Sequence, residues 1–103
     1  MPDFCIIHPN VHLGIGHQIS EYVILGVPPR GAQPGELATY IGAGAVIRSH
    51  TVIYAGNRIG ARFQAGHSVL VRESNEIGDD VSIGSHSVIE HHVKLADLVR
   101  IHS

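Results

Sequence analysis

Residues 77–88 read IGDDVSIGSHSV, two successive hexapeptides that each open with Ile-Gly and carry a valine near the end. Stepping by six from Ile41 reaches this aliphatic position eleven times, as far as Ile101. Ten of these eleven residues are Ile, Leu or Val, and Ala65 is the exception. The same step of six is kept earlier in the chain by Ile7, Leu13, Ile19 and Leu25. A repeat of six residues therefore runs along nearly the whole sequence.

A period of six excludes an α-helix, because six steps of about 100° scatter the aliphatic residues over three faces. It suits short strands, in which the aliphatic residue and the residue two before it point inward. Glycine often follows the aliphatic residue, as at Gly42, Gly60 and Gly78, and we expect it to let the chain turn. Three hexapeptides then make a triangular coil of about 18 residues, and coils stack about 4.8 Å apart as parallel sheets.

One segment breaks the period. Leu25 and Ile41 are 16 residues apart, which is neither two nor three hexapeptides. The residues between them are rich in turn formers, namely Gly26, Pro28, Pro29, Gly31, Pro34 and Gly35. This composition predicts a loop that leaves the coil stack at about residues 27–40. Arg30 is the one basic residue of this loop.

Residues 18 apart are expected to stack in columns along the coils. Asn57 and Asn75 fall one coil apart on an inward position, which predicts an amide ladder along the stack. Phe63 falls in an inward column of small and medium side chains, where it is expected to fill the core.

The chain has 103 residues, and we expect it to form one domain over residues 1–103. Its composition also excludes several functions. A net charge of −2 with only 16% charged residues argues against a nucleic-acid partner. Cys5 is alone, so an intrachain disulfide and a cysteine-based zinc site are excluded. No apolar run reaches the roughly 18 residues of a membrane span, and Met1-Pro2-Asp3-Phe4 lacks a signal-peptide pattern. We therefore expect a cytoplasmic protein that does not insert into membranes.

The blocks that open at Ile41, Ile77 and Ile83 resemble the hexapeptide repeat of left-handed parallel β-helix proteins. The resemblance covers nearly the whole chain and predicts an all-β, left-handed parallel β-helix of about five to six coils with one excursion loop. Most members of this class are acyltransferases that act as trimers, and γ-type carbonic anhydrases form a second branch. A prism this small also leaves flat faces, so we expect a homo-oligomer, a trimer by the resemblance.

The segment from Ile89 to Asp97 is similar to the pattern I-x-H-x-x-x-I-G-[DE] in hexapeptide acyltransferases that act on sugars and nucleotide sugars. That resemblance implies His91 as the general base and acetyl-CoA or another acyl-CoA as the co-substrate. His92 stands where the sugar acetyltransferases have an acidic residue, so Glu73 or Glu90 is left to supply a carboxylate. His67, His92 and Arg30 are the predicted substrate-binding residues. Leu95-Ala96 replaces the usual Ile-Gly, and Ser103 follows His91 by only twelve residues, so we expect the C-terminal coils of that family to be lacking.

Two alternatives stay open. His50, His86 and His91 have spacings of 36 and 5, which match the zinc ligands that γ-type carbonic anhydrases share across a trimer interface. Three imidazoles with an open fourth position generate a zinc hydroxide near neutral pH. However, Ser85 separates the middle histidine from its Ile-Gly pair, and no Arg-Gly-Asp precedes His50. The other alternative is a β-helix that only assembles and has no catalytic activity.

Overall fold

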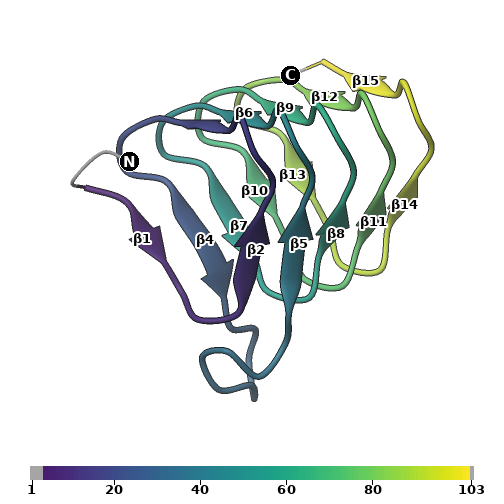
Figure 1. The fold of residues 1–103 in the computed structure, drawn as a ribbon. Helices are drawn as coiled ribbons and strands as arrows, with labels where there is room; N and C mark the ends of the chain where they lie inside the picture. The colour runs from purple at the N-terminus through teal and green to yellow at the C-terminus, as the bar shows by residue number, and fades with distance from the viewer. Residues whose placement is uncertain (1–3, 103) are drawn as a thin grey trace.

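The computed structural model describes residues 4–102 and folds them as a left-handed parallel β-helix. Three parallel sheets of five strands each enclose one core, and the described part of the chain contains no helix (Figure 1). The fold class expected from the repeat is therefore confirmed. The described residues include no helix long and apolar enough to pass through a bilayer.

The strands follow the period of six, and every third strand belongs to the same sheet. Sheet A contains β1 (Ile6–Ile7), β4 (Ile24–Val27), β7 (Val52–Tyr54), β10 (Leu70–Val71) and β13 (Val88–Ile89). Sheet B contains β2 (Val11–Leu13), β5 (Thr39–Ile41), β8 (Arg58–Ile59), β11 (Glu76–Ile77) and β14 (Lys94–Leu95). Sheet C contains β3 (Gln18–Ile19), β6 (Val46–Ile47), β9 (Gln64–Ala65), β12 (Ser82–Ile83) and β15 (Arg100–Ile101). Each group of three consecutive strands is one coil, numbered 1 to 5 from β1 to β15.

The core is built from the repeated aliphatic position and the residue two before it. Leu25, Ile53 and Val71 pair in register in sheet A and are fully buried. Phe63 is also fully buried, as its inward column predicts. Each strand thus contributes its aliphatic side chain to the interior, and the burial of these side chains holds the coils together.

The turns between sheets differ from the expectation in one respect. The residue with positive φ is the second residue of each turn, and it is usually not glycine, as at His92 (φ 58) and Asp80 (φ 57). The glycine after the aliphatic residue has another role in sheet B. A Cβ atom on Gly60 would lie 2.8 Å from the carbonyl carbon of Gly78, and one on Gly78 would lie 2.8 Å from the backbone nitrogen of Asp97. Glycine is therefore used there because successive coils approach closely, and not to make the turn.

The excursion leaves the stack between β4 and β5, at residues 28–38, slightly shorter than expected. It lies at the corner where sheet A passes to sheet B, which we call the AB corner (Figure 1). Asn10 Nδ2 donates to Gly35 O (3.2 Å), and Gly56 N donates to Ala38 O (3.1 Å). These bonds join the base of the loop to the turns of the coils on both sides. Arg30 is exposed.

Candidate functional site

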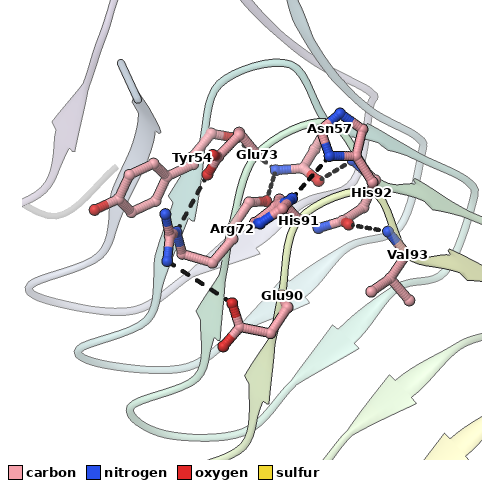
Figure 2. A network of polar contacts seen from close by, with 9 residues as sticks. Tyr54, Asn57, Arg72, Glu73, Glu90, His91, His92 and Val93 are labelled. Atoms are coloured by element: carbon pink, nitrogen blue, oxygen red, sulfur yellow. Dashed lines mark hydrogen bonds and ion pairs between the residues drawn. The ribbon is translucent and has the colours of Figure 1, made fainter. Parts of the chain in front are cut away.

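The histidine predicted as the general base lies in the AB corner of coil 5, in the turn between β13 and β14 (Figure 2). His91 and His92 are both exposed, and their rings meet edge to face with centroids 5.0 Å apart. The Nδ1 atoms of the two rings are 2.8 Å apart, which is hydrogen-bonding distance. The turn therefore presents a coupled histidine pair to the surface.

The short contact between the two Nδ1 atoms limits how the two rings can be protonated. Only one proton fits between the two Nδ1 atoms, so one ring donates and the other accepts. A neutral ring that donates from Nδ1 has an unprotonated Nε2. When His91 is the donor, its Nε2 is a free base, and His92 fixes that tautomer. In that tautomer His92 orients the His91 ring, as a carboxylate does in many catalytic pairs; when His92 is the donor, the free Nε2 belongs to His92 instead.

An arginine-centred network lies one coil beneath the pair. Arg72 Nε donates to Glu73 Oε1 (3.2 Å), and Arg72 Nη1 lies 3.8 Å from Glu90 Oε1. The Arg72 guanidinium also stands 5.4 Å from the centre of the Tyr54 ring. The network joins coils 3, 4 and 5 along the outer edge of sheet A (Figure 2).

Glu73 is the better placed of the two carboxylates considered for the site. A hydrogen bond from its own backbone N–H lowers the pKa of Glu73, and the charges of Arg72 and His91 lower it further against a partial desolvation. Glu73 is hence an anion near His91 at neutral pH. Its hydrogen bond, however, is with Arg72, and the hydrogen-bond partner of the His91 ring is His92.

The turn is held from inside by buried asparagines. Asn75 Oδ1 accepts from Val93 N (2.7 Å), directly after the histidine pair, and Asn75 Nδ2 donates to Arg72 O (2.9 Å). Asn57 repeats this one coil lower, because its Oδ1 accepts from Asn75 N (3.1 Å) and its Nδ2 also donates to Arg72 O (2.7 Å). The amides do form a ladder, but its rungs are the backbone groups of the next coil and not other amides.

The other predicted substrate residues lie elsewhere on the prism. His67 is at the corner between sheets C and A, the CA corner, where its Nδ1 is 2.8 Å from Ser49 Oγ. Sheet A separates it from His91. Arg30 shares the AB corner with His91, but it belongs to coil 2 and His91 to coil 5. Of these residues, a single chain therefore brings only His92 to His91.

The three histidines of the zinc alternative are divided between two corners. His50 and His86 belong to one column at the CA corner, two coils apart, and His91 is at the AB corner. Within residues 4–102, no three His, Cys, Asp or Glu side chains of one chain are grouped so as to hold a metal ion. A site built from these histidines would need residues of more than one chain.

Sequence reasoning missed Arg72 and Tyr54. The available signal was their spacing, because Tyr54, Arg72 and Glu90 are 18 residues apart and form one outward column beside His91. The chain was also compared with known proteins, and no protein-family model, curated protein or solved structure matches it.

Proposed function

We propose that the protein is an acyltransferase of the hexapeptide-repeat kind, which moves an acyl group from acyl-CoA to an amine or hydroxyl of a sugar or nucleotide sugar. The observation that supports this most is the exposed His91–His92 pair with its 2.8 Å contact between the Nδ1 atoms. An exposed histidine whose Nδ1 is engaged by a neighbouring ring is suited to general-base catalysis near neutral pH when its other nitrogen is unprotonated.

In the proposed reaction, His91 Nε2 accepts the proton of the acceptor amine or hydroxyl while that nitrogen or oxygen attacks the thioester carbonyl carbon. Collapse of the tetrahedral intermediate breaks the C–S bond. The thiolate of coenzyme A leaves and takes the proton back from the His91 imidazolium. No covalent enzyme intermediate is formed, so Cys5 has no part in the reaction.

The surface beside the pair supports this proposal. A hollow of about 490 Å³ lies over sheet B, and its lining includes Arg58, Gly78 and Lys94. Lys94 follows His92 by two residues, so the hollow begins next to the histidine turn. Its two basic side chains suit the phosphates of a coenzyme A ester, although Glu76 and Asp97 also line the hollow and Lys94 is paired with Glu76. We propose that the working form is a homo-oligomer, a trimer by the resemblance, in which a neighbouring chain brings the loop with Arg30 to this surface.

The test is release of free thiol from acetyl-CoA in the presence of a panel of amino sugars and nucleotide amino sugars. His91→Ala is expected to lower turnover about a hundredfold or more, because the base is removed. His86→Ala is the matched control, since His86 is an exposed turn histidine at the CA corner, in the turn between β12 and β13. It should leave turnover unchanged.

Each alternative function has its own outcome in this test. Stoichiometric zinc in the wild type would favour the metal enzyme over the acyltransferase, provided that zinc is lost in the variants His50→Ala, His86→Ala and His91→Ala. Absence of thiol release with every acceptor, from a folded protein, would favour the non-catalytic assembly module.

A further inference from the structure

The outer face of sheet A differs from the other two faces of the prism. Its first outward position is aliphatic in all five coils, and we call this set the sheet A stripe: Ile6, Ile24, Val52, Leu70 and Val88. Ile6 and Val88 are each 54% exposed, and the three between them are partly exposed. An unbroken aliphatic stripe over the full height of a sheet is not expected on a surface that faces water alone.

The corresponding positions of sheets B and C are mostly polar. In sheet B they are His12, Tyr40, Arg58, Glu76 and Lys94. In sheet C they are Gln18, Val46, Gln64, Ser82 and Arg100. The side chains of sheet B already pair with one another, since Arg58 lies over the Tyr40 ring (4.8 Å) and Lys94 Nζ is 3.5 Å from Glu76 Oε2. The hexapeptide is the same in all three sheets, so the repeat itself does not require an apolar outer face.

The apolar surface continues from the stripe onto the CA corner. Phe4 and Tyr22 stack with ring centroids 5.5 Å apart, and Tyr22 stacks on His50 at 5.1 Å. Phe4 is 64% exposed and Tyr22 is 51% exposed. These rings precede Ile6, Ile24 and Val52 by two residues each, so the aromatic column borders the stripe.

We propose that a second copy of this chain covers the sheet A stripe and the aromatic column. A sheet face is nearly flat, and a flat aliphatic surface is complementary in shape to another such surface. The column on the other side of the stripe carries Arg72 and Glu90, which already pair within one chain at 3.8 Å, so a copy can lie against it without burying an unpaired charge. An unlike partner would need to supply a flat apolar face of the same height, and a copy of the chain has one.

The area of the face determines how much of the surface a copy must cover. Five strands spaced about 4.8 Å apart and about four residues wide give a flat area of roughly 300–400 Å² per copy. A stable interface needs about 800 Å² per partner, so the stripe alone is too small. The contact must therefore extend over the aromatic column on one side and the edge with Tyr54, Arg72 and Glu90 on the other. His91 and His92 then lie at the margin of the interface, where the neighbouring copy forms one wall of the proposed site.

The experiment measures molecular mass by light scattering and native mass spectrometry from 1 to 100 µM, at low salt and in 1 M NaCl. The wild-type protein is expected at a multiple of 11.0 kDa in both salts, since an apolar contact is not screened. Val88→Arg and Leu70→Arg are expected to weaken association at least about tenfold, because each introduces a charge into the contact.

Gln64→Arg is the matched control, because Gln64 occupies the same outward position in sheet C of the coil below Leu70. It should leave the mass unchanged. Val88 is already exposed, so its variant keeps the test valid if Leu70→Arg does not fold, as checked by circular dichroism. A wild-type monomer at 100 µM, or dissociation by Gln64→Arg but not by Val88→Arg, would overturn the proposal.

The claim that a neighbouring copy forms a wall of the site rests on the proposed function. The experiments distinguish failure of that claim from failure of the proposed function. If Val88→Arg is a monomer that keeps full thiol release, the shared wall is wrong and the acyltransferase stands. If the wild type assembles through sheet A but releases no thiol, the interface stands and the proposed function fails.

Discussion

The AB corner and the corner between sheets B and C, the BC corner, use one hexapeptide in opposite ways. At the BC corner the position after the aliphatic residue is glycine in coils 3 and 4, Gly60 and Gly78, and successive backbones nearly touch there. At the AB corner the same position holds Tyr54, Arg72 and Glu90, whose long side chains point outward (Figure 2). At one corner successive backbones pack closely, and the other carries long polar and aromatic side chains.

The two corners are also held from opposite sides. At the BC corner exposed carboxylates hold the turns from outside, because Asp79 Oδ1 accepts from Ala61 N (2.8 Å) and Asp97 Oδ1 accepts from Asp79 N (2.7 Å). At the AB corner the buried amides of Asn57 and Asn75 do this from inside. Because buried amides hold the turn of His91 and His92 from inside, these two outward side chains are not needed to hold it. The exposed histidine pair lies in a turn that is held in this way.

The largest effect that tests this comparison is expected at Asn75. Asn75→Ala leaves Val93 N without its acceptor and takes one of two donors from Arg72 O, at partly buried hydrogen bonds made by a buried side chain. Polar groups left unsatisfied there make the variant less stable by about 3 kcal/mol. Urea unfolding at fixed protein concentration measures the loss.

Asp79→Ala is the paired variant in the same coil. It also removes one acceptor of a backbone N–H, that of Ala61, but at an exposed turn where water replaces the carboxylate. Its cost should stay below about 1 kcal/mol. Equal losses in the two variants would show that inside and outside support do not differ.

A somewhat smaller effect is expected from Gly78→Ala at the BC corner. The added methyl group would lie 2.8 Å from the backbone nitrogen of Asp97, and backbone has little room to move. Overpacking of this kind costs about 2 kcal/mol. Gly44→Ala separates crowding from backbone conformation, because Gly44 has φ +74 and its nearest contact would be Arg62 Cγ at 3.5 Å.

We expect Gly44→Ala to cost about 1 kcal/mol, for the left-handed conformation alone. Thermal and urea unfolding of both variants give the comparison. A cost for Gly78→Ala no greater than that for Gly44→Ala would contradict close coil approach as the reason for glycine in this column.

The sequence predicted the fold well because the period of six is a physical constraint on every coil. It fixed the inward columns, including Phe63 and the two asparagines, and it located the excursion within a residue or two. The reason for the glycines was wrong, because close approach between coils depends on how coils stack and leaves no signal within one hexapeptide.

The site was less predictable than the fold. His91 was predicted as the general base from a local pattern and stays a prediction, but its contact with His92 depends on ring orientations that a sequence does not contain. The sheet A stripe is visible at 18-residue spacing once the outward position is known. We did not predict it because the repeat is defined by the inward residue of each strand.

The smallest predicted effect is a loss of stability in acid that both corners share. A hydrogen bond from Arg62 to Asp80 lowers the pKa of the Asp80 carboxyl, and a backbone hydrogen bond lowers that of Glu73. A carboxyl whose pKa is lower in the folded state stabilises the protein above its unfolded pKa near 4, and this contribution is lost as the pH falls through the folded value. Both side chains are near the surface, so solvent screening keeps the loss small. The drop of the urea midpoint between pH 6 and pH 3 should therefore be smaller in Asp80→Asn and in Glu73→Gln than in the wild type.

Glu73→Gln should also alter the pH profile of thiol release, because Glu73 lies near His91, whereas Asp80→Asn at the BC corner should not. An unchanged profile in both variants would separate Glu73 from the histidine pair.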